Sequence, residues 1–271
     1  MPQIEQGVLF NYFLVLFLLL TYLVHNAGST FSATLVQDSL RLGIDTLPSY
    51  AFRCVNSASG WTLPAQAQAY WAWAKGPCHS LPNPPDSTPA LIFSYCLPSF
   101  QSSYFSGSLK LGPTGQPRRI RTTPLLRNPR RPSLYYVNLT GINVGRVRVS
   151  LPTDYLAFDP NKGSGTIIDS GTVITRFVGP VYNAIRDEFR YQVKGPFFIR
   201  GGFDTCFVKT YENLPYENTL IHTAYGGMAC LAMAAAPNNV NSALTNFQQQ
   251  NLRVLFDTVN NRVGIARELC N

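Results

Sequence analysis

The chain has 271 residues, a length that allows one large hydrophobic core or two modest ones. Hydrophobic residues make up 45% of the chain and charged residues only 13%, and glycine and proline contribute 20 each. This composition suits short strands joined by many turns, so we expect a mainly β fold.

The net charge of +8 raises the question of an acidic partner such as a nucleic acid. Much of the surplus lies in one proline-rich stretch, and aromatic residues are not interleaved with it as a stacking surface would require. We therefore interpret residues 113–132 as a solvated basic linker and expect no nucleic-acid binding. Its arginines are Arg118, Arg119, Arg121, Arg127, Arg130 and Arg131.

Residues 1–29 contain an apolar run from Val8 to Val24, followed by small residues at positions 27–29. The run indicates a signal peptide, although Glu5 is the only charge before it, where a signal peptide normally has a positive region. An uncleaved membrane anchor is the alternative, because the run is only slightly shorter than a usual span of about 20 residues. Membrane association is expected only if this segment is retained. Either route leads to an oxidising compartment.

The cysteines and histidines show no metal-ligand spacing. None of the six cysteines forms a CxxC pair, and the three histidines have no cysteine or glutamate at a suitable distance in the sequence. We expect neither a metal ion nor a cofactor. Asn138-Leu139-Thr140 is an acceptor sequence for N-glycosylation in a secreted chain.

In the first half of the chain, residues 30–52 alternate apolar and polar side chains and predict strands. The alternation is absent from residues 60–90, where we expect irregular structure. It resumes at Leu91–Cys96, which predicts a further strand.

The second half is more regular. Tyr135–Leu139 and Val144–Val149 predict strands, and Thr166–Ile168 predicts a short buried strand that leads into Asp169. Apolar residues at helical spacing predict a helix over Val181–Phe189, with Pro180 suited to its first turn. A final hairpin is expected around the turn Asn260-Asn261. Its strands are Leu252–Asp257 and Val263–Ala266.

Asp169-Ser170-Gly171-Thr172 places a carboxylate between two apolar strands. A general base that activates water must be held rigidly, and Gly171 would let backbone N–H groups approach the carboxylate. The hydroxyl groups of Ser170 and Thr172 can donate hydrogen bonds that fix its orientation. The tetrapeptide by itself is also what an ordinary β-turn prefers, so its setting decides between the two interpretations.

That setting resembles the nepenthesin-like branch of plant pepsin-type aspartic proteases. The resemblance rests on the Asp169 loop, the helix after it and the segment Asn246–Asp257. It also takes in Tyr135–Gly145, Phe203–Phe207 and Gly264–Cys270, and it is strongest after Ser133.

The resemblance implies two similar β lobes, each of which supplies one aspartate to a shared site. Residues 133–271 correspond to a fairly complete C-terminal lobe that contributes Asp169, and residues 30–112 correspond to a truncated N-terminal lobe. In the family, one carboxylate is the base for the attacking water while the other protonates the carbonyl. The first aspartate loop is expected before Thr30, where the chain has none. Asp45-Thr46-Leu47 lacks the glycine, so we interpret it as structural.

The resemblance also implies disulfides between Cys206 and Cys230 and between Cys96 and Cys270. A secreted plant protein of this family would lie in the apoplast or cell wall, with a membrane-anchored form as the alternative. We expect an aspartic endopeptidase by family, acting on peptide or protein substrates and impaired in this chain by the missing aspartate.

Two alternatives remain open. One is a non-catalytic pseudo-protease or inhibitor-like binding protein on the same fold. The other is a symmetric dimer with two copies of Asp169 facing each other, but no feature of the sequence indicates a self-complementary interface, so we expect a monomer.

Overall fold

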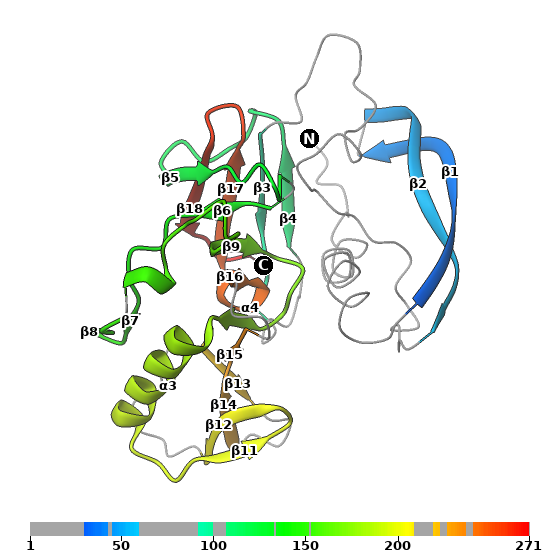
Figure 1. Cartoon of the computed structure of the whole chain (residues 1–271). Coiled ribbons are helices and arrows are strands. Elements are labelled where there is room, and N and C mark those ends of the chain that lie inside the picture. The colour runs from blue at the N-terminus through cyan, green and yellow to red at the C-terminus, as the bar shows by residue number, and fades with distance from the viewer. Residues whose placement is uncertain are drawn as a thin grey trace.

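The computed structural model describes residues 30–42, 45–59, 92–99, 107–132, 134–151, 153–208, 219–222, 227–236 and 241–270. In this part of the chain the protein is mainly β, as the composition predicted (Figure 1). The apolar leader within residues 1–29 and the tract 60–90, for which irregular structure was expected, lie outside the described residues.

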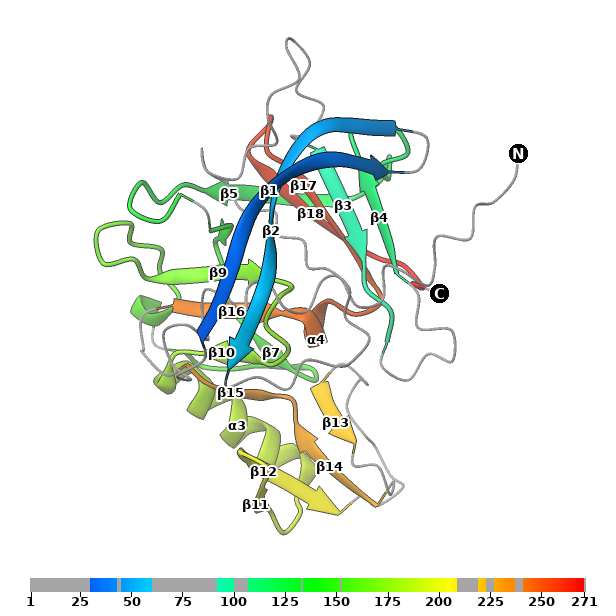
Figure 2. The ribbon, with the colours of Figure 1, turned by 90° about the vertical axis from the view of Figure 1, so that its right-hand side faces the viewer.

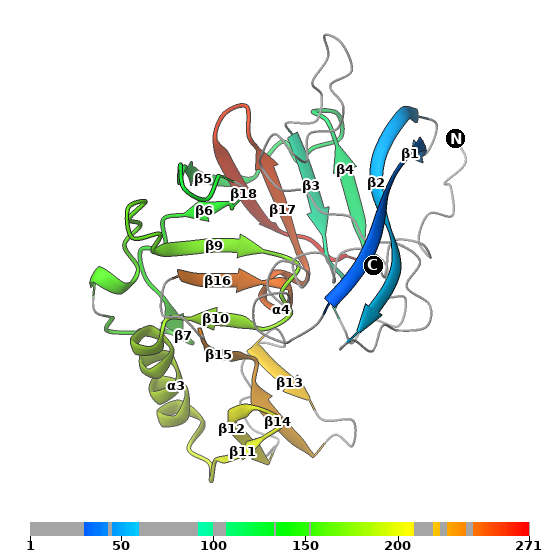
Figure 3. The ribbon, with the colours of Figure 1, turned by 45° about the vertical axis from the view of Figure 1, so that its right-hand side comes forward.

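The largest sheet has ten strands in the order β15-β10-β16-β9-β6-β5-β18-β17-β3-β4. Figure 3 shows β9, β16 and β10 side by side, running across the direction of β17, β3 and β4, so the sheet turns a corner along its length. β16 is parallel to β9 and β10 is parallel to β15, and the other pairs are antiparallel. The strands are β3 (Ile92–Cys96), β4 (Ser108–Leu111), β5 (Arg121–Leu126), β6 (Tyr136–Val137), β9 (Gly165–Asp169), β10 (Thr175–Phe177), β15 (Met233–Ala235), β16 (Asn241–Thr245), β17 (Leu252–Asp257) and β18 (Arg262–Arg267).

In the described part of the chain, three smaller sheets accompany it. β1 (Thr30–Leu42) and β2 (Asp45–Ser59) form a long antiparallel ribbon, which Figure 2 shows as a pair of curved strands. A four-stranded sheet has the order β11-β12-β14-β13, and β7 pairs with β8. Their bounds are β7 (Asn143–Val144), β8 (Val147–Arg148), β11 (Phe198–Arg200), β12 (Phe203–Val208), β13 (Leu220–His222) and β14 (Met228–Leu231).

The predicted helix is α3 (Gly179–Val193), with proline in its first turn. It ends where Lys194 adopts a left-handed conformation (φ 51°) and donates its backbone N–H to the carbonyl of Arg190. The other helical segments among the described residues are short: α4 (Asn246–Gln249) and a 3₁₀ turn at Thr153–Tyr155. Among the described residues, no helix has the length and apolar character to cross a membrane.

Apolar side chains form two cores. The first lies under α3, where four buried side chains of the helix pack on strands of the four-stranded sheet. The second lies between β3, β17, β18 and β9, and Phe93 stacks on Phe256 there with ring centroids 4.9 Å apart. Ile168 belongs to this second core, so packing fixes the strand that ends at Asp169. The helix residues of the first core are Val181, Tyr182, Ile185 and Phe189.

The segment expected to be a basic linker, 113–132, contains strand β5, so the linker expectation needs correction. β5 pairs with β18 on one side and with β6 on the other, and Leu125 is buried in the second core. The arginines of this segment are exposed, as a solvated stretch requires. Arginines surround the short apolar pattern of this segment, so the sequence did not indicate a strand. Pairing with β6 and β18 makes the segment a strand.

Candidate active site

Strand β9 carries Asp169 to the edge of the second core. All five residues of β9 are buried, and neighbours on both sides, β6 and β16, pair with the strand. Gly165 begins it at φ +131°, and an added Cβ would come within 3.1 Å of the Phe158 ring. Asp169 itself is only 6% exposed. A carboxylate in this position has little freedom to move.

The turn after β9 supplies hydrogen bonds to both carboxylate oxygens. The backbone N–H of Gly171 donates to Oδ1 at 2.9 Å, and the hydroxyl of Thr172 donates to Oδ2 at 2.6 Å. We predicted from the sequence that the Thr172 hydroxyl donates a hydrogen bond to this carboxylate. Ser170 differs, because the hydrogen bonds to the carboxylate from the described residues come from Gly171 and Thr172 and not from the Ser170 hydroxyl.

The start of α4 supports this turn from the opposite side. The backbone N–H of Asn246 donates to the carbonyl of Thr172 at 2.9 Å, and its side-chain amide donates to the carbonyl of Ser170 at 3.2 Å. Thr245 pairs with Asp169 in the parallel register of β16 and β9, and its hydroxyl donates to the carbonyl of Val173 at 2.9 Å. The turn is therefore held by residues more than 70 positions away in the chain.

Burial is the main influence on the charge of Asp169. It raises the pKa of this carboxyl above its ordinary value, and the hydrogen bonds from Thr172 and Gly171 lower it only in part. In the described part of the chain, no second carboxylate contributes to this rise in the pKa of Asp169. Asp169 thus keeps a proton to a higher pH than a solvent-exposed aspartate, as a group that exchanges protons during catalysis requires.

Comparison with known proteins finds relatives that match most of this chain. A family model described as xylanase inhibitor C-terminal matches residues 134–216. Aspartyl protease AED3 of Arabidopsis thaliana is 55% identical over 266 residues, which are 91% of this chain and 59% of the relative. Aspartyl protease 25 of Oryza sativa subsp. japonica is 49% identical over 90% of this chain and 61% of the relative. The chain is similar to plant aspartic proteases over about nine-tenths of its own length.

Two further matches extend the comparison. Aspartic proteinase nepenthesin-1 of Nepenthes gracilis is 32% identical over 90% of this chain and 59% of its own length. A crystal structure titled edgp has a TM-score of 0.64 at 18% identity, covers 89% of this chain and 69% of that one, and so shares the fold. The chain spans about 60% of the length of these curated relatives.

Two disulfides join distant segments within the described residues. Cys96 of β3 is bonded to Cys270 near the chain end, across 174 positions. Cys206 of β12 is bonded to Cys230 of β14, where the two residues are directly paired in the sheet. These are the two pairs that the family resemblance implied.

The other candidate residues lie away from Asp169. Asn138, the predicted glycosylation site, is exposed after β6. Asp45-Thr46-Leu47 forms the start of β2, in register with the end of β1, and makes no turn of the Asp169 kind.

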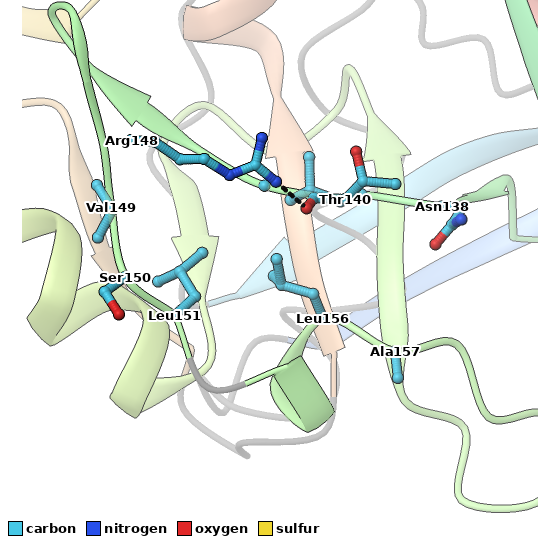
Figure 4. A pocket seen from close by; sticks show the side chains of 10 residues that line it. Asn138, Thr140, Arg148, Val149, Ser150, Leu151, Leu156 and Ala157 are labelled. Carbon is cyan, nitrogen blue, oxygen red and sulfur yellow. Dashed lines mark hydrogen bonds between the residues drawn. The ribbon is translucent and has the colours of Figure 1, made fainter.

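A pocket of about 590 Å³ lies next to Asn138, and the Asp169 loop does not line it (Figure 4). In it, Arg148 donates a hydrogen bond to the carbonyl of Thr140 at 2.8 Å. In the described part of the chain, no three histidine, cysteine, aspartate or glutamate side chains are grouped to hold a metal ion.

Sequence reasoning missed the residues that support the loop from a distance. Asn246 lies in a segment that the sequence assigned to the family resemblance, but it was given no role. The signal available was the mostly polar segment 246–251 ahead of an apolar strand. Such a run does not reveal which turn it contacts.

Proposed function

We propose that Asp169 is one of the two catalytic carboxylates of an aspartic endopeptidase that hydrolyses peptide bonds in extended protein substrates at acidic pH. The observation that carries the proposal is the geometry of Asp169, which is buried at the end of β9 with both oxygens hydrogen-bonded by its own turn. The identity with plant aspartyl proteases supports it.

The chemistry follows from a proton shared between two acids. Two adjacent carboxylates cannot both ionise without a large electrostatic cost, so one carries the proton and the other is the base, as aspartic proteases exemplify. The base takes a proton from water as its oxygen attacks the peptide carbonyl, and the acid protonates the carbonyl oxygen. In Asp169, burial favours the protonated form while Gly171 and Thr172 stabilise the ionised form. Both states are therefore accessible to it.

We further propose that this chain alone is impaired as an enzyme. Within its 271 residues Asp-Ser-Gly occurs once, at Asp169-Ser170-Gly171, and Asp-Thr-Gly does not occur. A lone carboxylate has no partner with which to share the proton, so half of the mechanism is missing.

The test compares the chain with a chimera in which a plant aspartyl protease supplies the segment upstream of Thr30, including its first aspartate loop. Cleavage of denatured casein between pH 3 and 5 is measured for both. We expect cleavage by the chimera, a loss of about 10³-fold or more in Asp169→Asn, and little change in Asp187→Asn, a control on the exposed side of α3.

Each result has a distinct meaning. Undiminished cleavage by the Asp169→Asn chimera would show that Asp169 is not catalytic. Cleavage by the chain alone that depends on Asp169 would overturn the proposed impairment and point to a dimer that brings two copies of Asp169 together.

A non-catalytic binding role is the second candidate. It is favoured by the match of residues 134–216 to a family model described as xylanase inhibitor C-terminal. Inhibition of a purified xylanase by the chain, undiminished in Asp169→Asn, would support this role over proteolysis.

We also propose that the protein is exported to the apoplast or cell wall as a glycosylated monomer. The apolar run Val8–Val24, the exposed Asn138 sequon and the two disulfides support export. Retention of the leader would instead anchor the chain in the membrane. Glycosidase-sensitive mass at Asn138 in protein recovered from the plant cell wall would be the expected finding.

A further inference from the structure

The positive charges of this chain are concentrated in one stretch of the sequence. Residues 87–153 contain nine lysines and arginines and no aspartate or glutamate, whereas the rest of the chain is nearly balanced, with 13 basic and 14 acidic residues. The net charge of +8 therefore comes from about a quarter of the chain. Six of the nine cations are the arginines of segment 113–132.

Strand β5 arranges these six arginines along one line. Three lie at or just before its start and three follow its end, and the strand of six residues between them spans about 20 Å. Pairing with β18 on one side and β6 on the other holds the strand in place. We call this set the basic band: Arg118, Arg119, Arg121, Arg127, Arg130 and Arg131.

The turn after β5 fixes one end of the basic band. Asn128 is 1% exposed, and its backbone carbonyl accepts the N–H of Arg131 at 3.2 Å while its Oδ1 accepts the N–H of Arg130 at 3.0 Å. The guanidinium of Arg130 donates to the carbonyl of Asn161 at 2.7 Å. The guanidinium of Arg131 lies against Gly163, 3.4 Å from the place of an added Cβ. These two side chains are therefore held in position before any ligand arrives.

The basic band keeps its charge unneutralised. All six arginines are exposed. In the part of the chain that the structure describes, the ion pairs are formed by other cations, including Arg262, which faces Pro124 of β5 and pairs with Asp257. Like charges held on one strand repel one another, and an anionic ligand would relieve that repulsion.

Two features of the basic band favour one class of polyanion. The sequence has no aromatic residue from position 106 to position 134, so the band offers no surface on which nucleic-acid bases could stack. The planar fork of an arginine side chain matches a carboxylate with two parallel hydrogen bonds. A linear polymer that carries carboxylates on its sugar rings fits both features.

We propose that the basic band binds an acidic polysaccharide of the polyuronate class, with its carboxylates paired to the arginines along β5. The inference rests on the proposed export to the cell wall, where the bound polymer would retain the chain. It is independent of catalysis. β9 begins beside the Arg131 corner and ends at Asp169, whose turn contacts α4, so the band and the Asp169 turn lie at opposite ends of this strand (Figure 3).

The test measures binding of the purified full chain to polygalacturonate at about pH 6, where carboxyl groups are ionised. Fully methyl-esterified polygalacturonate is the control polymer, because it has the same backbone without the charge. The band variant is Arg118→Gln with Arg119→Gln and Arg127→Gln. The matched control variant loses the same charge from exposed positions near α3 and β11, as Arg146→Gln with Lys194→Gln and Arg200→Gln.

We expect the parent chain to bind polygalacturonate but not its methyl ester, and to bind more weakly as NaCl is raised from about 20 to about 200 mM. The band variant should bind at least about tenfold more weakly, and the control variant less than about threefold more weakly. Thermal unfolding should be alike for all three proteins, because the substituted side chains are exposed.

Three results would overturn the proposal: no binding by the parent chain, equal binding of the methyl ester, or equal weakening in the two variants, which would indicate net charge alone. Competition by a single-stranded oligonucleotide as strong as that by polygalacturonate would also overturn it, since the band would then not select a polyuronate. If the band variant does not fold, Arg118→Gln and Arg127→Gln are tested singly, each with about twofold weaker binding expected. Binding is measured in vitro and without cleavage, so its failure is distinguishable from a failure of export or of the casein assay.

Discussion

Asp169 is held where its charge is disfavoured, and this has a consequence for stability. Its folded-state pKa is raised above the ordinary value of 3.8, so the folded protein binds the proton more tightly than the unfolded chain does. The contribution of this group to stability is complete below about pH 3.8 and is lost as the pH rises through the raised folded-state value. The site is thus better suited to an acidic environment than to a neutral one.

We predict that Asp169→Asn unfolds at a higher urea concentration than the parent chain at pH 7. The amide keeps the shape of the side chain and an acceptor for the Gly171 N–H, but it carries no charge to desolvate. The difference should shrink as the pH falls below 4. Urea unfolding followed by fluorescence between pH 3 and 7 measures it, and a difference that does not vary with pH would contradict the explanation.

Asp204 in the other core shows the opposite behaviour. Burial opposes its ionisation, but hydrogen bonds from Tyr182, Thr205 and Arg186 outweigh this and lower its pKa. The stability that it contributes is therefore present above its ordinary value of 3.8 and is lost as the pH falls through the lowered value.

Asp204→Asn should therefore lower the free energy of unfolding at pH 7 by about 1 kcal/mol, a modest value because the side chain is 35% exposed. The deficit should disappear as the pH falls below 3.8, the reverse of the trend for Asp169→Asn. The same urea titrations test both variants, and parallel pH trends for the two would be inconsistent with the assigned pKa directions.

At the scale of elements, a buried guanidinium joins the strands around the second core. Arg253 of β17 is 1% exposed, and it pairs with Glu268 and donates to the hydroxyls of Ser94 on β3 and Ser108 on β4. Glu268 has a side chain that is 38% exposed, and the pKa of its carboxyl is lowered first by its hydrogen bond with Arg253. The two members of the pair thus differ in their access to water.

This asymmetry predicts that Glu268→Ala destabilises the protein more than Arg253→Met. The first change leaves a buried cation without its carboxylate, at a cost of about 3 kcal/mol, whereas the second leaves a carboxylate that water can solvate, at about 1 to 2 kcal/mol. Chemical denaturation at pH 7 provides the comparison. An equal or larger loss in Arg253→Met would mean that packing of the arginine stem matters more than its charge.

At the scale of the whole molecule, the long disulfide constrains the unfolded chain more than the short one. Cys96 and Cys270 are 174 positions apart and Cys206 and Cys230 are 24 apart. The chain-entropy estimate for loops of these lengths is about 5 and about 3 kcal/mol.

Replacing each pair by alanine should therefore lower stability more for Cys96 and Cys270 than for Cys206 and Cys230. Thermal unfolding of the two double variants measures the difference. A larger loss for the short bridge would show that contacts in the folded four-stranded sheet, rather than chain entropy, dominate its effect.

The local elements were predictable because their signals are local. Alternation marked β1, a short apolar run marked the strand before Asp169, helical spacing marked α3, and the turn at Asn260-Asn261 marked the hairpin of β17 and β18. β5 was missed because arginines and prolines surround a pattern of only six residues, and its pairing with β6 and β18 makes it a strand. Local sequence signals therefore predicted these elements, whereas β5 forms a strand because of its pairing with neighbouring strands.

The sequence by itself indicated the resemblance to aspartic proteases, the mainly β class and Asp169 as the candidate catalytic residue, because these signals are local in the chain. Only the tertiary structure decided what surrounds Asp169. Asn246 contacts Ser170 across 76 positions, and Thr245 contacts Val173 across a similar span. No sequence pattern encodes contacts of that range, since they arise when β3, β9, β16 and α4 pack into one sheet and one core.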